Sequence, residues 1–168
     1  MCGNNLHPFN HFIMKKVIIS FAVVIFSFCA TAQSYTSSLD SLINNVNIDS
    51  LVSFVRILSG EDSVYIKGTK LLIEQRVYNT NDFAAEYIHE KLMSYGLDTY
   101  REDYSEHGSN IYAIKEGSKY PEEYYFICAH YDGVTYHCAD DNASGSASVL
   151  EAARLMSTMA AASRRMVN

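Results

Sequence analysis

The sequence predicts an α/β fold in which helices flank a mixed β-sheet. Two segments with helical periodicity, 39–58 and 80–95, precede a region of shorter period that contains three strand-like stretches. The third stretch, 124–129, is apolar without alternation, which is typical of a strand covered on both faces. A polar loop and an Ala-rich helical segment follow it. Strand, loop and helix in this order indicate a helix-flanked sheet.

Capping residues mark the ends of the two helical segments. In the first segment, Asp49 is the expected N-cap of the second piece and Gly60 follows its end. In the second segment, Thr80 or Asn81 is the expected N-cap, and Gly96 lies just past the end. Both segments are therefore expected to pack an apolar face against the sheet or one another.

The predicted strands are 98–104, 110–115 and 124–129. Turn-forming residues separate them at 106–109 and 117–121. Active sites in helix-flanked sheets lie beyond the carboxyl ends of the strands. The polar residues after the third strand are therefore the candidates for a functional site.

The last predicted helix starts at about Ala143 or Ser144 and ends near Ala160. Residues 158–168 offer no glycine stop and no strand pattern, and the pair Arg164-Arg165 is expected to form a frayed cationic end. This ending predicts the product of a truncated or frame-shifted gene.

A secretory signal peptide is predicted at residues 14–32. Two lysines give it a positive start, a short apolar run follows, and Ala30-Thr31-Ala32 is a small-x-small cleavage site. The apolar run is too short to cross a bilayer, so the mature chain is expected to be secreted or periplasmic, without a membrane anchor. Residues 1–13 are expected to be an over-extended start. Lipoprotein processing at Cys29 is a weaker alternative, because Phe28 stands where a small residue is expected.

Residues 33–168 are expected to form one domain or part of one, since the 168-residue chain is 48% hydrophobic and 19% charged. The predicted signal holds two of the 13 basic residues and none of the 19 acidic ones, so 11 basic and 19 acidic residues remain. This acidic balance argues against nucleic acid as a partner. Export makes a disulfide between Cys128 and Cys138 possible, but two buried free thiols are favoured because the sequence does not fix their separation.

The candidate site lies in the stretch 126–145, which reads FICAHYDGVTYHCADDNASG. His130 and Asp132 are two residues apart in an extended segment, so their side chains are expected to point the same way. Imidazole is the commonest zinc ligand, and a carboxylate usually holds its second nitrogen. Asp132 is expected to orient His130, although the pair also suits two ligands of one site. The carboxylate of Asp141 is able to bridge two metal ions.

Structural explanations stand beside these functional ones. A histidine at a strand end is commonly structural or solvated, and Asp-Asn-x-Ser-Gly is ordinary turn and helix-cap chemistry. The spacing alone leaves both interpretations open.

Two motifs in order resemble a known family. HYD at 130–132 and ADDNASG at 139–145, followed by the helix SASVLEAARL, are similar to the secreted co-catalytic zinc aminopeptidases. This family includes bacterial leucyl aminopeptidase, aminopeptidase S and aminopeptidase Y, with glutaminyl cyclase as a relative. A weaker likeness covers RVYNTNDFAAEYIHEKLMSYGL at 76–97.

The resemblance implies a three-layer zinc-exopeptidase-like fold, two zinc ions and a peptide substrate. By position, His130 would be a ligand of one zinc and Asp141 the carboxylate bridging both. Asp132 would orient His130, and Asp140 would help to shape the turn. The implied reaction is removal of N-terminal residues from peptides by a water that two zinc ions activate.

Several parts of the family pattern are absent from this sequence. Members continue into a strand that ends in a Glu-Glu pair, the general base and a zinc ligand, and later supply an Asp and a His. Here Glu151 lies inside a helix and is not expected to be the base, and His137 is the last histidine, in a loop that rarely supplies a ligand. The chain is expected to be the N-terminal part of such an enzyme, with the C-terminal half missing, and catalytically incomplete.

Two other functions stay open at this point. One is a glutaminyl-cyclase-like or dipeptidase-like relative, and the other is a non-catalytic exported domain. The sequence does not fix the oligomeric state.

Overall fold

The structure, a computed structural model, describes residues 37–159 and 164–167. The predicted signal peptide at 14–32 and the start before it lie outside the described residues. The chain divides into two compact units after Ser41. Of the first unit only the beginning of helix α2 (Ser37–Asn44) is described.

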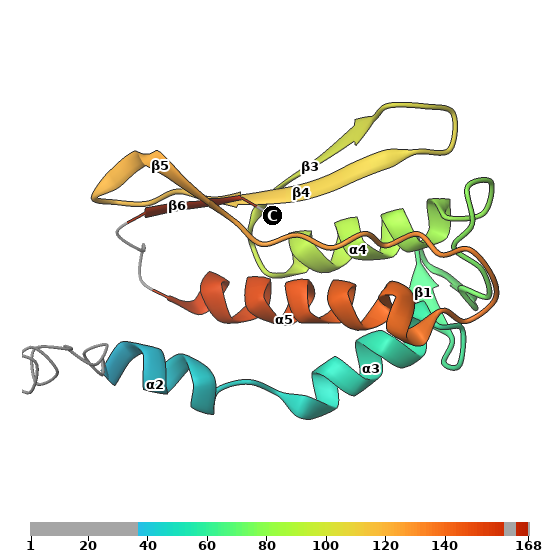
Figure 1. Cartoon of the computed structure of the whole chain (residues 1–168), viewed down its shortest axis with the longest axis horizontal. Coiled ribbons are helices and arrows are strands. Elements are labelled where there is room, and N and C mark those ends of the chain that lie inside the picture. The colour runs from blue at the N-terminus through green and yellow to red at the C-terminus, as the bar shows by residue number, and fades with distance from the viewer. Residues whose placement is uncertain (1–36, 160–163, 168) are drawn as a thin grey trace, which may run out of the picture. The chain divides into compact units, whose positions relative to one another are not determined.

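The described part of the second unit contains the end of α2, helices α3, α4 and α5, a short π-helical turn (Ala139–Ala143), a two-stranded hairpin and a four-stranded sheet (Figure 1). Its elements are α3 (Ile48–Leu58), β1 (Val64–Ile66), β2 (Thr69–Leu71), α4 (Asp82–Ser94), β3 (Asp98–Asp103), β4 (Ser109–Lys115), β5 (Tyr120–Phe126), α5 (Ser144–Thr158) and β6 (Arg164–Val167). The sheet has the strand order β3-β4-β6-β5, with β5 and β6 parallel and the other pairs antiparallel. The predicted α/β class with a mixed sheet is confirmed.

The helices of this unit lie in layers beneath the sheet. Helix α4 packs against β3 and β4, and α5 packs beside α4 and against α3, as Figure 1 shows. The side chains of Leu58, Leu92 and Leu150, one from each helix, are fully buried between these layers. Helix α5 is therefore central, because it packs against both α3 and α4.

The third strand differs from the prediction. It starts at Tyr120, inside a segment predicted to be a turn, and ends at Phe126 rather than at residue 129. All seven of its residues are exposed, so the prediction that both faces are covered is wrong. The reason is its place in the sheet: β5 is the edge strand, whereas α4 packs on β3 and β4.

The segment after the last helix also differs from the prediction. No strand was expected there, and Arg164-Arg165 were expected to fray, yet residues 164–167 form β6 between β4 and β5. Val167 pairs with Ile114 on one side and with Phe126 on the other. Two strands with free backbone groups accept a third strand through main-chain hydrogen bonds, which a side-chain pattern does not report.

The start of α3 has a different cap from the expected one. Asn47 is the N-cap, and its side chain accepts a hydrogen bond from Ser50 N at 2.9 Å, whereas Asp49 lies within the first turn.

The hairpin of β1 and β2 was not predicted. Its turn contains Lys67 and Gly68, both with positive φ.

A buried carboxylate joins the start of α3 to α5. Glu151 in α5 is 3% exposed, and its Oε1 accepts a hydrogen bond from Asn47 N at 2.7 Å. Arg154, one turn further along α5, pairs with the same carboxylate at 2.6 Å and donates to Asn45 O at 2.7 Å. Glu151 thus satisfies a backbone N–H that the helix start leaves unpaired.

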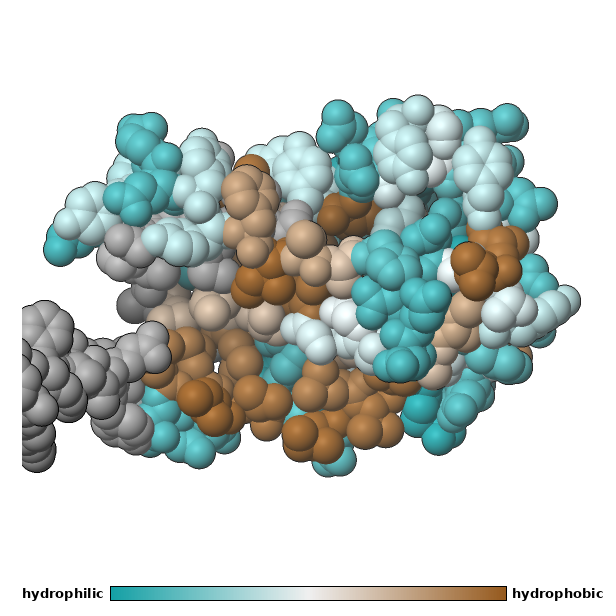
Figure 2. Space-filling model, in the orientation of Figure 1, coloured by the Kyte–Doolittle hydropathy of each residue, from teal (hydrophilic) through white to brown (hydrophobic). Residues whose placement is uncertain are grey.

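Apolar side chains are exposed on α3. Figure 2 shows apolar surface over this helix, where Ile48 and Val52 are 65% and 51% exposed.

Within residues 37–159 and 164–167, no helix has both the length and the hydropathy needed to cross a membrane.

Gly60, at the end of α3, is expected to tolerate alanine poorly. Its φ is +74°, and an added Cβ would lie 2.8 Å from Ile73 O. Gly60→Ala is expected to lower the free energy of unfolding by about 2–3 kcal/mol, because left-handed strain and crowding add. Gly68 is the matched control: its φ is +78° but nothing lies within 4 Å of the added Cβ, so Gly68→Ala is expected to cost about 1 kcal/mol. Urea unfolding measures both losses of unfolding free energy. Equal losses in Gly60→Ala and Gly68→Ala would contradict this expectation, because the structure around Gly60 would then shift to make room for the added Cβ.

Candidate active site

His130 lies in an irregular segment four residues past the end of β5, between two carboxylates. Its Nδ1 is 3.1 Å from Asp132 Oδ1, and its Nε2 is 3.3 Å from Asp141 Oδ1. All three side chains are more than half exposed. The three residues predicted from the sequence therefore come together in the structure, with the imidazole in the middle.

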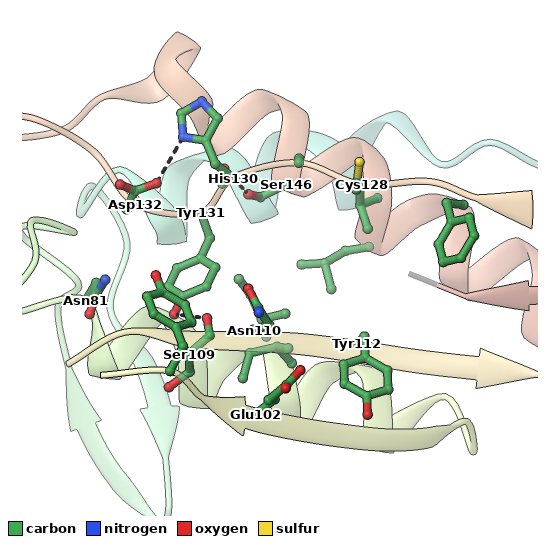
Figure 3. A pocket seen from close by; sticks show the side chains of 17 residues that line it. Asn81, Glu102, Ser109, Asn110, Tyr112, Cys128, His130, Tyr131, Asp132 and Ser146 are labelled. Carbon is green, nitrogen blue, oxygen red and sulfur yellow. Dashed lines mark hydrogen bonds and ion pairs between the residues drawn. The ribbon is translucent and has the colours of Figure 1, made fainter. Parts of the chain in front are cut away.

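Two neighbouring side chains hold the backbone around His130. Ser146 Oγ of α5, in a residue that is 5% exposed, donates to His130 O at 3.1 Å. The hydroxyl of Tyr131 donates to Ser109 O of β4 at 2.8 Å. Figure 3 shows the His130 ring on one side of the segment and the Tyr131 ring on the other, toward Ser109. Helix α5 and strand β4 thus fix which way the imidazole points.

Asp141 reaches His130 because the chain is extended just before α5. Asp141 and Asn142 have non-helical dihedral angles inside the wide turn 139–143. Asn142 Oδ1 then accepts a hydrogen bond from Gly145 N at 2.9 Å, which caps the first turn of α5. Asp140, expected to shape this turn, contributes its main-chain carbonyl, which accepts from Ser144 Oγ at 3.2 Å.

The space between His130 and Asp141 suits a metal ion. Zinc binds nitrogen and oxygen ligands at about 2.0–2.2 Å with tetrahedral angles, which places two ligand atoms about 3.3 Å apart. The distance from His130 Nε2 to Asp141 Oδ1 is 3.3 Å. Asp132 contacts the opposite ring nitrogen, so the geometry favours it as an outer partner of His130 over a second ligand of the same ion.

This pair is only part of a donor set. Nowhere in residues 37–159 and 164–167 do three or more His, Cys, Asp or Glu side chains gather so that they would hold one metal ion. A four-coordinate zinc site needs two ligands besides His130 and Asp141.

A cavity of about 500 Å³ lies beside the site, between β4 and the segment that follows β5. His130 and Asp132 lie on its rim, and side chains from α4, β4 and α5 form its wall (Figure 3). Apolar members of this wall are Ile88, Ile111, Val149 and Leu150. The cavity lies beside the side chain of Tyr131, whose pKa is raised because burial disfavours the phenolate.

Other titratable residues considered from the sequence have structural partners. Glu151 is bound by Arg154 and Asn47, and the hydrogen bond from Arg154 lowers its pKa. The Nδ1 of His137 lies 2.9 Å from Ser59 O. His107 pairs with Asp82 at 3.2 Å. Glu151, His137 and His107 are therefore not partners of His130 in the candidate site.

The two cysteines near the site are free thiols, as the sequence favoured. Their predicted burial is wrong, because Cys128 is exposed and Cys138 is partly exposed. Cys128 follows the end of β5, the exposed edge strand.

Sequence reasoning missed Arg76, a buried residue beneath the loop that joins Asp132 to Asp141. It is 2% exposed and donates hydrogen bonds to carbonyls on that loop. Its partners lie between 18 and 62 residues away in the sequence, so no local pattern indicates them.

Comparison with protein families identifies the segment that carries the site. Residues 110–168 match the model of peptidase family M28. This part of the chain is similar to the M28 peptidases. The match contains His130, Asp132 and Asp141, and the resemblance drawn from the HYD and ADDNASG motifs is confirmed at this level. M28 peptidases are generally zinc-dependent. No curated protein sequence matches the chain.

Two solved structures share the fold of this chain. LapB from Legionella pneumophila is similar with a TM-score of 0.60 and 16% identity, over 82% of this chain and 38% of LapB. Glutaminyl cyclase from Porphyromonas gingivalis is similar with a TM-score of 0.55 and 20% identity, over 73% of this chain and 44% of the cyclase. The chain thus spans about two fifths of the length of these structures, and at such identities the likeness concerns the fold.

Proposed function

We propose that this chain is the N-terminal part of an M28 metallo-aminopeptidase, which removes N-terminal residues from peptides. One observation carries the proposal: within the M28 segment, the His130 imidazole has one nitrogen on Asp132 and the other facing Asp141 at 3.3 Å. The ligands would be His130 and Asp141, with Asp141 able to bridge a second zinc ion.

Asp132 has a defined task in this proposal. In this proposal the carboxylate of Asp132 accepts a hydrogen bond from Nδ1–H of His130, which leaves the lone pair of Nε2 directed at Asp141. Ser146 keeps the backbone of His130 in place, so the ring does not need to be ordered when a metal arrives.

When bound, zinc would polarise the carbonyl of a peptide substrate and lower the pKa of a water molecule. Glu151 does not serve as the general base, because its carboxylate is 3% exposed and bound by Arg154 and Asn47 N. The described residues thus supply binding and orientation of the metal, and no side chain among them is placed to take a proton from water.

The proposal includes export of the chain through the signal predicted at 14–32, followed by action on peptides in the periplasm or outside the cell. The net charge of −6 over the whole chain supports a peptide rather than a nucleic acid as substrate.

The test uses the 168-residue chain as it stands. After equilibration with Zn²⁺ and dialysis, mass spectrometry is expected to find far less than one zinc per chain, because the described residues supply only two ligands of the proposed site. Incubation with aminoacyl-nitroanilides is expected to release no nitroaniline. Hydrolysis that disappears in His130→Ala would contradict this expectation and reveal ligands that the described residues do not show.

A glutaminyl-cyclase-like activity is the second candidate, supported by the fold shared with the enzyme from Porphyromonas gingivalis. Both activities would use the same His130 and Asp141. Peptides with N-terminal glutamine distinguish them in a protein with a complete site: a peptidase frees the first residue, whereas a cyclase releases ammonia and leaves the peptide whole.

A further inference from the structure

The guanidinium of Arg76 lies between the end of α3 and the loop 131–138. It donates to four main-chain carbonyls: Tyr131 O at 2.7 Å, His137 O at 3.0 Å, Cys138 O at 2.8 Å, and Leu58 O. Arg76 itself is 2% exposed. A buried cation is costly unless each of its donors is used, so this cluster of carbonyls indicates a specific task.

The main chain of Arg76 adds a further bond to the same loop. Arg76 O accepts a hydrogen bond from Gly133 N at 2.8 Å, and the preceding residue, Gln75, forms a β-bridge with Tyr136. Arg76 therefore holds the loop at its beginning, its middle and its end.

The candidate zinc ligands lie just outside the two ends of this loop. Tyr131 is the neighbour of His130, and Cys138 lies three residues before Asp141. Cys138 O, besides its bond to Arg76, accepts from Ala143 N at 3.3 Å at the start of α5. One planar side chain thus bonds both ends of the loop at once, and a planar fork fixes the separation of the groups that it binds.

We propose that Arg76 is the positioning residue that sets the distance between His130 and Asp141. This inference rests on the proposed function, because the distance matters as a metal-binding distance. Arg76 touches neither side chain and acts through the carbonyls of Tyr131 and Cys138. Burial lowers the pKa of Arg76, while the charges of Asp132 and Asp141 oppose that shift, and an arginine remains a cation at neutral pH.

Two substitutions and a control separate positioning from general stability. Arg76→Lys keeps the charge but concentrates its donors at one atom, and Arg76→Gln removes the charge. Leu92→Ala is the control, because Leu92 is fully buried in α4 and takes no part in the loop. All variants are compared at a temperature at which circular dichroism shows each to be folded.

The measurements are hydrogen exchange of residues 131–143 and titration with Zn²⁺. In both Arg76 variants, the amide hydrogens of residues 131–143 are expected to exchange at least about tenfold faster than in the unchanged chain. The affinity for Zn²⁺ is expected to fall at least about tenfold, which is the loss typical of residues that support a metal ligand. Leu92→Ala is expected to leave both quantities within about twofold of the unchanged chain, because exchange in a loop follows local opening.

The two proposals fail in different ways. The unchanged chain is expected to bind Zn²⁺ measurably in the titration, although too weakly to retain it through dialysis. If the titration detects no Zn²⁺ binding, the proposed function fails, and the exchange measurement still decides whether Arg76 holds the loop. Exchange in Arg76→Lys no faster than in Leu92→Ala would overturn the positioning role. Faster exchange with unchanged Zn²⁺ affinity would overturn it as well, since Arg76 would then be a purely structural residue.

Discussion

His130→Ala is expected to lower the affinity of the chain for Zn²⁺ by at least about a hundredfold. Loss of an outer partner costs about 10–100-fold, and loss of a ligand in a set of two removes half of the direct bonds. Asp141→Ala is expected to have an effect of the same size. The reason is that Asp141 Oδ1 lies 3.3 Å from His130 Nε2, so both atoms would bind the same zinc ion. Isothermal titration of Zn²⁺ into each variant measures these losses.

The Zn²⁺ affinity of Asp132→Asn is expected to lie between that of these variants and that of the unchanged chain, with a loss of about 10–100-fold. Asparagine keeps the shape of the side chain but loses the charge that holds the Nδ1 proton of His130. His107→Ala is the matched control, because His107 also lies between two acidic side chains, Asp82 at 3.2 Å and Glu106 at 4.0 Å. Equal losses for His107→Ala and His130→Ala would mean that Zn²⁺ binds acidic surface in general and not the proposed site.

Glu151→Ala is expected to lower the free energy of unfolding by about 3 kcal/mol. Removing one partner of a buried ion pair costs about 3–5 kcal/mol, and the lower end applies because Arg154 keeps 28% of its side chain in water. The variant also leaves Asn47 N without its acceptor at the start of α3. Urea unfolding measures the loss.

The effect of Glu151 is expected to fade in acid. The hydrogen bond from Arg154 holds the pKa of Glu151 below its ordinary value of 4.5. A carboxyl with a lowered pKa in the folded state stabilises the protein above about 4.5, and this contribution disappears as the pH falls through the folded value. The gap between the unchanged chain and Glu151→Ala should therefore narrow below pH 4.5. Asp62→Ala is the control, because Asp62 pairs with Arg56 at 2.7 Å on the surface and its removal should change stability little. A constant gap across this pH range would show that Glu151 acts through packing alone.

The candidate site was accessible to sequence reasoning because its parts are local. His130 and Asp132 are two residues apart, and Asp141 lies three residues before α5, whose first turn is capped by the hydrogen bond from Gly145 N to Asn142 Oδ1. Each of these relations spans a few residues, so strand alternation and helix capping are enough to predict it. The helices α3, α4 and α5 were predicted for the same reason, with bounds shifted by a few residues.

The parts that were missed depend on distant partners. The exposure of β5 follows from its place at the edge of the sheet, and β6 forms only where β4 and β5 both offer backbone groups. The role of Arg76 depends on carbonyls up to 62 residues away. Neither periodicity nor composition carries information about such contacts.

The exposed edge strand β5 has a consequence for the behaviour of this chain in solution. Tyr124 and Phe126 stack with ring centroids 6.3 Å apart on one side of a strand whose residues are all accessible, and the strand is outermost in its sheet. Exposed aromatic side chains that lie close together favour contact between copies of a protein. Concentrating the protein is therefore expected to promote self-association through these aromatic rings. Added salt is expected to strengthen this association, because it screens the repulsion between the acidic molecules.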